Sequence, residues 1–310
     1  MKRIFCLLSL CVVFLAYSKN ASAQYYFYDD DYYDNPIMFE VGASLGAMNC
    51  LTDIGGNKGI GKKFVKDINL GKTQFTGGAF FAVTYKNAVA LRLEYAFGKL
   101  SASDNVLSSV DVKDIARMRY NRNTEFRSNI SEFSLTTEIH PLFIFINYQE
   151  RESDPPRYSP YLLAGVGYFS FNPQARLKNG NWVDLQPLST EGQGFSKYTD
   201  VKPYKLQQIN FPVGLGIKYE LSRMFNVRGE FMYRVTTTDY LDDVSTVYSD
   251  PTWYSDYFTG SKLANALEMR DRQITYITGP GGKRGSPKQK DAYFSFNLKL
   301  SLSLGRERIR

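Results

Sequence analysis

The feature that most constrains this chain is a strict alternation of apolar and polar residues over stretches of about ten residues. It is clearest between Ala292 and Leu304, where every second residue is apolar and the residues between are Tyr, Ser, Asn and Lys. Successive side chains of a strand point to opposite faces, so this pattern predicts a β-strand with one apolar and one polar face.

Seven further segments show the same alternation and predict seven more strands. They are Ile37–Ala47, Phe75–Tyr85, Val89–Phe97, Ser131–Ile139, Tyr161–Phe169, Lys205–Leu221 and Phe225–Thr237. The sequence contains no apolar run of 18 residues, which excludes a bundle of membrane-spanning helices. The chain is therefore predicted to be all-β.

The polar faces of these strands carry charged residues of both signs. They are Glu40, Arg92, Glu94, Glu132, Glu138, Lys218, Glu220, Arg228, Glu230, Arg234 and Lys299. A soluble β-sandwich would bury the apolar faces and expose these charges. The strand length favours the inverse arrangement, since about ten residues match a tilted strand that crosses a bilayer. We therefore expect an eight-stranded antiparallel transmembrane β-barrel with long extracellular loops, its lumen plugged by a network of these charges.

The N-terminus predicts export. Residues 1–23 combine a basic start, an apolar run and Ala21-Ser22-Ala23, the order of a cleavable signal peptide. Cleavage removes Cys6 and Cys11 and leaves Cys50 alone, so no internal disulfide is expected. It also removes three basic residues, and the net charge becomes 35 minus 31, or +4. This balance is too mild to indicate nucleic acid.

The connections alternate in length and predict the topology. Tight turns at Lys86-Asn87 and Ser222-Arg223-Met224 belong on the periplasmic side, and the long connections lie outside. The expected organisation is an aromatic and acidic periplasmic segment over 24–36, a barrel over 37–304 and a basic tail over 305–310. The connection Pro141–Pro160 is long for the periplasmic side, which indicates a docking surface.

Two periplasmic segments are predicted to contact a partner. The candidate contact residues are Tyr25, Tyr26, Asp29, Asp30, Asp31, Asp34, Gln149, Glu150, Arg151 and Arg157. For the N-terminal segment, the alternative is an interfacial aromatic anchor followed by a solvated acidic stretch. The barrel surface itself is expected to contact outer-membrane lipid and lipopolysaccharide.

The sequence offers little for catalysis, and no cofactor is expected. Its single histidine, His140, shares a strand face with Glu138, yet we expect it to be structural and the protein to be no enzyme. Asp239, Asp242 and Asp243 are weak candidates for binding a metal ion. Their spacing does not match an EF-hand loop, and a solvated turn after the seventh strand is the favoured interpretation.

Several segments resemble outer-membrane barrels of the PorG type from Bacteroidota. The resemblance rests on Phe39–Asn49, Asn147–Arg151, Tyr161–Gly167, Pro203–Ile209 and Thr238–Ser245. It implies a component of the type IX secretion system, in which the barrel anchors a periplasmic ring of PorK and PorN at the outer membrane. Two alternatives remain: a structural or adhesive barrel that acts through its extracellular loops, and a small-solute porin.

Overall fold

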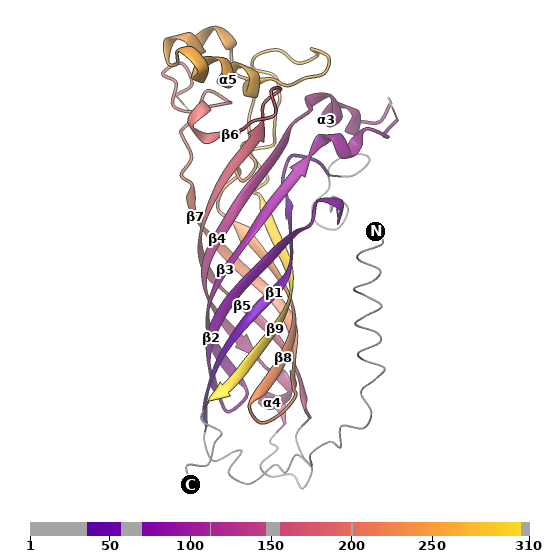
Figure 1. Ribbon diagram of the computed structural model, residues 1–310, viewed down its shortest axis with the longest axis vertical. Helices are drawn as coiled ribbons and strands as arrows, with labels where there is room; N and C mark the ends of the chain where they lie inside the picture. Colours follow the sequence, from indigo (N-terminus) through magenta and orange to yellow (C-terminus); the bar gives the residue numbers. More distant parts are fainter. Residues whose placement is uncertain (1–35, 57–69, 112, 147–155, 200, 305–310) are drawn as a thin grey trace. The chain divides into compact units, whose positions relative to one another are not determined.

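The computed structural model describes residues 36–56, 70–111, 113–146, 156–199 and 201–304. These residues form nine strands, of which all but the short β6 build a closed barrel (Figure 1). The strands are β1 (Ile37–Leu51), β2 (Gln74–Tyr85), β3 (Val89–Ser103), β4 (Glu125–Ile139), β5 (Tyr158–Arg176), β6 (Trp182–Asp184), β7 (Gln207–Glu220), β8 (Phe225–Thr236) and β9 (Ala292–Leu304).

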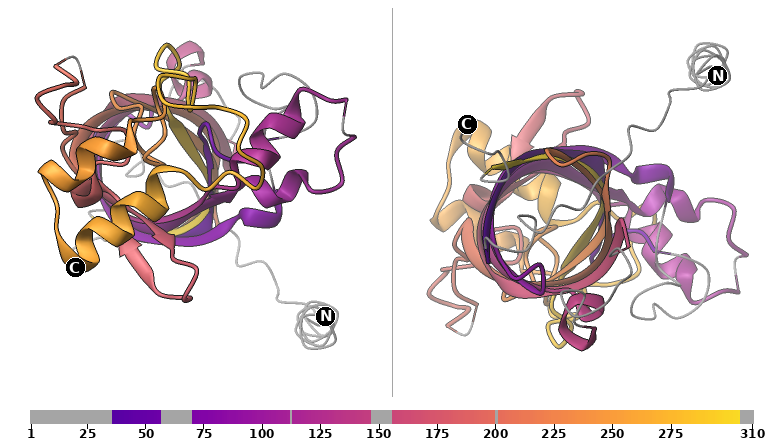
Figure 2. Two further views of the ribbon diagram at one scale, coloured as in Figure 1. Left: turned by 90° about the horizontal axis from the view of Figure 1, so that it is seen from above. Right: turned by 90° about the horizontal axis from the view of Figure 1, so that it is seen from below.

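Each barrel strand pairs antiparallel with its neighbours in the sequence. The ring closes where β9 pairs with β1, with Phe39 opposite Leu304 and Leu51 opposite Ala292. The pairing of β4 with β5 completes the other half of the wall. Figure 2 shows the closed ring from both ends. The predicted eight-stranded antiparallel barrel is confirmed.

The wall has its apolar face outside and its charged face inside. Along β9, Leu298 is 67% exposed whereas the next residue, Lys299, is 1% exposed. The same alternation repeats on every barrel strand, so an apolar belt surrounds a polar interior. In water this surface would be strongly unfavourable, whereas in a bilayer it faces lipid. The barrel is therefore a transmembrane one.

Several strands are longer than the alternation predicts. β1 continues to Leu51, β3 to Ser103 and β5 to Arg176, while β4 begins at Glu125. These extensions lie at one end of the barrel, where outward-facing residues become polar and the apolar period fades. The strands remain paired where the alternation of apolar and polar residues ends, because the backbone hydrogen bonds of the sheet do not depend on side-chain polarity. β7 begins at Gln207 and β8 ends at Thr236, slightly inside the predicted bounds.

Short connections gather at one end of the barrel, which we call the short-turn end. Lys86 and Asn87 have φ values of 49° and 57°, the left-handed pair typical of a two-residue hairpin turn. Residues 221–224 form the second turn. The connection between β4 and β5 begins with the helix α4 (Pro141–Phe145).

The opposite end, the long-loop end, carries an ordered head built by four long connections. It contains α3 (Ala116–Arg122), α5 (Gly260–Arg270) and the 3-10 helices η2 (Leu70–Lys72), η3 (Asp104–Leu107), η5 (Gln186–Leu188) and η6 (Pro251–Asp256). Viewed from above, segments of this head cross the barrel mouth (Figure 2). Among the described residues, no helix has the length and apolar character needed to cross a membrane.

Candidate functional site

All eleven charged residues expected in the lumen are buried there. Their exposed fractions range from 0% to 8%, and they comprise five basic and six acidic groups. Each of these residues occupies a strand position whose side chain points into the barrel. The barrel interior is therefore a candidate site in which charge is nearly balanced.

The basic residues form a row on neighbouring strands. Lys218 on β7 pairs in register with Arg228 on β8, and Arg228 pairs with Lys299 on β9. Like charges directly opposite one another destabilise a sheet. This row is therefore compatible with folding only when carboxylates approach it from elsewhere.

Those carboxylates come across the lumen. Arg228 contacts Glu138 on β4 at 2.7 Å and also contacts Glu40 on β1. Lys218 also pairs with Glu40, and Lys299 lies 2.6 Å from Glu94 on β3. None of these four pairs joins adjacent strands. The ion pairs form only once the sheet has closed, so they link closure of the barrel to neutralisation of its interior.

The longest link spans opposite sides of the ring. Arg92 on β3 lies 2.7 Å from Glu230 on β8, and these strands are four positions apart in the eight-membered ring. Arg92 also contacts Glu138 at 2.6 Å. Tyr161 donates a hydrogen bond of 2.8 Å to Glu230. Side chains thus cross the full width of the lumen at this level.

An aromatic ring completes this layer. The ring of Phe80 lies within 6 Å of three cationic groups, those of Arg92, Arg228 and Lys299. Such contacts add a modest attraction and exclude water from the ion pairs. A further pair, Arg234 with Glu132 at 2.6 Å, lies closer to the long-loop end.

Above the charged layer, an apolar plug fills the barrel mouth. Leu241 and Val244, from the connection between β8 and β9, are 0% and 1% exposed. They pack with inward-facing strand residues such as Met48, Leu100 and Phe169. The loop segment that the sequence predicted as a solvated turn is therefore buried, which corrects that expectation. Its apolar residues are separated by aspartates, so the sequence shows no apolar pattern there that would predict burial.

A polar cap lies beyond the plug and joins all four long connections. We define it by Asp53, Asp104, Arg122, Glu191, Asp239, Asp242, Asp243, Arg284 and Asp291. Arg122 binds Asp104 through two nitrogens, at 2.8 and 2.9 Å, and donates to the carbonyl oxygen of Asp53 at 2.6 Å. Arg284 donates to Glu191 at 2.9 Å and to the carbonyl oxygen of Asp243 at 2.7 Å. Sequence reasoning missed both arginines, because loops lack a period that pairs distant residues.

The cap contains more acid than base, and this raises the pKa values of its aspartates. Burial raises the pKa of Asp239 to about 7, and that of Asp243 to about 6 although Arg284 opposes the shift. Burial, with the nearby Asp53 carboxylate, also raises the pKa of Asp242. The pKa of Asp291 lies well above its ordinary value for the same reason, with Asp242 contributing. Asp239, Asp242 and Asp291 are therefore partly or largely protonated near neutral pH, whereas Asp243 is mainly ionised beside Arg284.

The three weak metal candidates lie in this cap but point to separate partners. Asp242 accepts backbone N–H groups from Ile54 and Val244, each at 2.9 Å. Asp243 accepts from Tyr204 at 2.7 Å and from Thr190, while Asp239 accepts from Ser245 at 2.6 Å. No group of three or more potential ligands in the described part of the chain is arranged to hold a metal ion.

His140 lies at the short-turn end, where its side chain contacts those of Ser159 and Glu138. Its Nδ1 is 2.8 Å from Oγ of Ser159, and its Nε2 is 3.4 Å from a carboxylate oxygen of Glu138. Although hydrolases use this order of groups, all three side chains are more than nine-tenths buried, and Glu138 already binds two arginines. We interpret the arrangement as a structural link between the α4 connection and the lumen.

Of the ten predicted partner-contact residues, only Arg157 lies within the described residues. It is exposed at the short-turn end, and its carbonyl oxygen accepts a hydrogen bond from the Glu220 N–H at 2.8 Å. The other nine lie outside the described residues, as do the predicted signal peptide and the basic tail.

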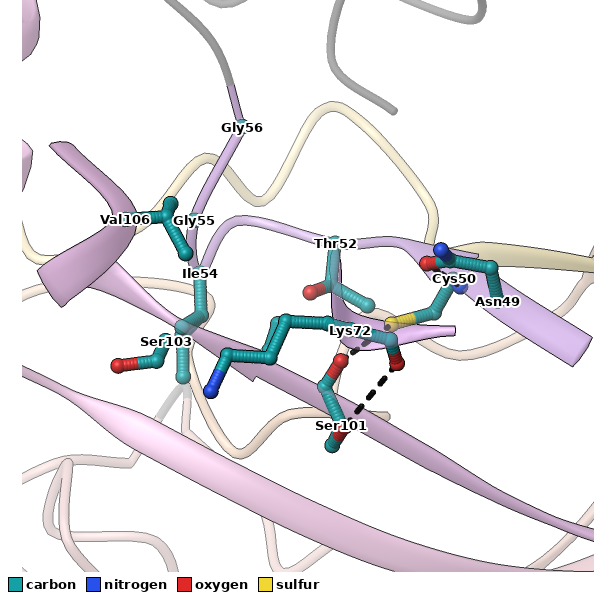
Figure 3. A pocket seen from close by; sticks show the side chains of 11 residues that line it. Asn49, Cys50, Thr52, Ile54, Gly55, Gly56, Lys72, Ser101, Ser103 and Val106 are labelled. Carbon is teal, nitrogen blue, oxygen red and sulfur yellow. Dashed lines mark hydrogen bonds between the residues drawn. The ribbon is translucent and has the colours of Figure 1, made fainter. Parts of the chain in front are cut away.

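A small pocket opens beside the cap, between the ends of β1 and β3 and the helix η2 (Figure 3). Its wall includes Cys50, Lys72 and Ser101, and the Ser101 hydroxyl donates to the Lys72 carbonyl oxygen at 3.2 Å. The pocket has room for about one water molecule. It is too small for an organic ligand.

Solved structures with a similar fold include three bacterial membrane proteins. Neisserial surface protein A is 9% identical with a TM-score of 0.38, over 85% of this chain and 96% of that chain. A major outer membrane protein from Thermus thermophilus is 10% identical with a TM-score of 0.37, over 87% and 100%. The attachment invasion locus protein Ail of Yersinia pestis is 7% identical with a TM-score of 0.35, over 86% and 97%.

At the level of sequence, no curated protein matches this chain. One family model does match, and it is described as a domain of unknown function, DUF6089. The match covers residues 33–256, which is about seven-tenths of the chain and runs from four residues before β1 to the end of η6. The chain therefore belongs to the DUF6089 family.

Proposed function

We propose that this protein is a non-enzymatic outer-membrane barrel that acts as a fixed anchor through its two ends. The observation that carries this proposal is the filled lumen. Buried ion pairs cross the interior between strands that are not neighbours, and the apolar plug lies above them. A lumen of this kind supports attachment and leaves no path for a protein cargo.

The placement in the outer membrane and the orientation are part of the proposal. The expected signal peptide directs export, and closed barrels with an even number of strands are typical of the outer membrane. In such barrels the short turns face the periplasm, which would direct the ordered head to the cell exterior. α4 and Arg157 would then face the periplasm.

We further propose that the anchored partner is a periplasmic ring of the PorK and PorN type in a type IX secretion system. This finer assignment rests on the sequence resemblance to PorG-type barrels. It is supported by the long connection after β4, which adds periplasmic surface where other turns are minimal. The expected contact residues are those of 25–34 and 149–157.

Crosslinking in intact cells tests the ring assignment. The chain is tagged in an external loop, crosslinked and purified from outer membranes, and its partners are identified by mass spectrometry. Recovery of a periplasmic lipoprotein with its ring partner in stoichiometric amounts is expected. Recovery of porins and lipopolysaccharide alone would assign the function to the outer loops instead.

A matched variant locates the contact. Asp29, Asp30, Asp31 and Asp34 are replaced by Asn, and the control replaces Asp111, Asp114, Asp184 and Asp256 of the head by Asn. Loss of crosslinking and of protein secretion is expected only in the first variant. Equal secretion by both variants, with normal barrel assembly, would exclude the acidic segment as the contact.

Planar bilayer recordings test whether the barrel is closed. The purified protein is expected to give no stable ohmic conductance at neutral pH, because the charged layer spans the lumen. Steady single-channel currents would favour a small-solute porin and contradict the anchor proposal.

A further inference from the structure

Three strands of the barrel continue beyond the apolar belt at the long-loop end. The belt ends there in an aromatic row, in which Tyr95 on β3 pairs with Phe133 on β4 and Phe133 pairs with Tyr168 on β5. The rings of Tyr95 and Phe133 are 4.7 Å apart. Aromatic side chains of this kind gather at the boundary between hydrocarbon and headgroups.

The next outward row, Phe97, Ser131 and Ser170, is mixed, and the outward face becomes fully polar beyond it. Two residues past Phe97, Lys99 pairs in register with Asn129, and Asn129 pairs with Asn172; Ser101, Arg127 and Gln174 form the next polar row. We call this surface the polar apron and define it by Lys99, Ser101, Arg127, Asn129, Asn172 and Gln174. Because it follows the apolar belt along the strands, it is the surface expected to meet lipid headgroups.

Lys99 and Arg127 form a pair of cations on this surface. They are diagonal neighbours on the same face of adjacent antiparallel strands, a relation that places such residues about 7–8 Å apart, within reach of one shared ligand. In the described part of the chain neither has a carboxylate within 4 Å. By contrast, Arg176 at the far edge is paired with Glu125 at 3.3 Å.

The guanidinium of Arg127 is held in place from two sides. Its Cζ lies 3.9 Å from the centre of the Trp182 ring, and its Nε donates to Gln174 at 3.0 Å. The amides of Asn172 and Gln174 both donate to Asp184, which fixes them in turn. Of the two carboxylates that border the apron among the described residues, Glu125 is already paired with Arg176, and Asp184 is the one that faces Lys99 and Arg127. A fixed guanidinium loses little entropy when it binds an oxyanion.

We propose that the polar apron binds the phosphorylated saccharide headgroup of an outer-leaflet glycolipid, with Lys99 and Arg127 sharing one phosphate. The acyl chains of that lipid would lie against Tyr95, Phe133 and Tyr168. This occupant fits because the apron is continuous with the lipid-facing belt and carries unpaired positive charge at its border. The inference rests on the proposed orientation, in which the long-loop end faces the cell exterior.

The test is a binding titration of the full-length protein in detergent, followed by native mass spectrometry. The ligand is phosphorylated lipid A, and the variant is Lys99→Gln with Arg127→Gln. The control, Lys86→Gln with Lys262→Gln, removes two charges that stack on Tyr85 and Phe258 outside the apron. Charge-assisted hydrogen bonds to phosphate predict about tenfold weaker binding or more for the apron variant, and unchanged binding for the control.

Further ligands in the same titration distinguish a lipid A phosphate from other phosphates. Dephosphorylated lipid A and phosphatidylglycerol are expected to bind the wild-type protein at least about tenfold more weakly, and Lys99→Arg is expected to retain binding. Equal binding by apron and control variants would overturn the proposal, as would equal binding of dephosphorylated lipid A. Competition by millimolar inorganic phosphate alone would indicate a free-phosphate site instead.

The lipid and the ring are tested separately. Failure to recover a periplasmic partner by crosslinking leaves the lipid titration unaffected, because the apron and the short-turn end lie at opposite ends of the barrel. Far-UV circular dichroism and the unfolding temperature check that the exposed substitutions leave the barrel folded.

Discussion

The lumen and the cap are both buried and charged, but they handle charge in opposite ways. The lumen holds five basic and six acidic groups and pairs them across the barrel. The cap holds seven acidic groups around Arg122 and Arg284, and several of its aspartates have raised pKa values. Charge in the lumen is therefore neutralised by ion pairs, whereas charge in the cap is neutralised partly by protons.

This difference follows from the backbone. Strands place inward residues at a fixed register, so an arginine on β8 meets a carboxylate on β4 or β1 as soon as the sheet closes. Loops have no such register, and their carboxylates are satisfied mainly by nearby N–H and hydroxyl groups, as Asp242 shows. The two regions should respond differently to mutation and to pH.

The largest effect is expected from removing one partner of a lumen pair. Arg228→Met leaves Glu138 and Glu40 with fewer cations in a site that water does not reach, at a cost of about 3–5 kcal/mol of barrel stability. Urea unfolding followed by far-UV circular dichroism measures this loss. The outward substitution Lys99→Met is the control, and it should change stability by less than about 0.5 kcal/mol.

The Arg234–Glu132 pair provides a check on the mechanism. If an uncompensated charge is the cause, replacing both partners, Arg234→Met with Glu132→Leu, should be less destabilising than Arg234→Met alone. If the double variant loses as much free energy of unfolding as the two single variants together, then packing, not charge, dominates in the lumen.

A smaller and more local effect is expected in the cap. Arg284→Met removes donors to Glu191 and to the Asp243 carbonyl, which should loosen the head by about 1–3 kcal/mol and leave the barrel intact. Both tryptophans, Trp182 in β6 and Trp253 in η6, lie in the head. Tryptophan fluorescence therefore follows the head, while circular dichroism follows the strands. If Arg284→Met lowered the stability measured by fluorescence and by circular dichroism equally, the head and the barrel would not unfold independently.

The same distinction explains what the sequence could predict. The eleven lumen charges are readable because a period of two places each one on the inward face, as Lys299 between Leu298 and Leu300 illustrates. Their individual partners are not readable, since pairing across the ring depends on register and closure. In the cap, Asp239, Asp242 and Asp243 attract attention by their density, but burial of the intervening Leu241 and the following Val244 depends on tertiary packing. Nothing near Arg122 or Arg284 in the sequence indicates that they hold loops together.

The smallest expected effect is a pH dependence confined to the head. Asp239 has a pKa of about 7 in the folded cap, above its ordinary value of 3.8, because burial disfavours its charged form. The folded state then holds a proton that the unfolded state has released. The head should therefore be most stable at acidic pH and lose part of that stability as the pH rises toward 7. Above the folded pKa, this contribution levels off.

Asp239→Asn is the matched variant for this effect. Oδ1 of Asp239 has no hydrogen-bond partner among the described residues, so an uncharged amide in its place mimics the protonated acid. The fluorescence-detected urea midpoint should fall between pH 5 and pH 8 in the wild-type protein and fall less in the variant. The midpoint detected by circular dichroism should stay nearly constant in both. If the urea midpoint of the wild-type head does not change over this pH range, the cap aspartates are not neutralised by protons. The cap and the lumen would then differ only in which groups neutralise their carboxylates.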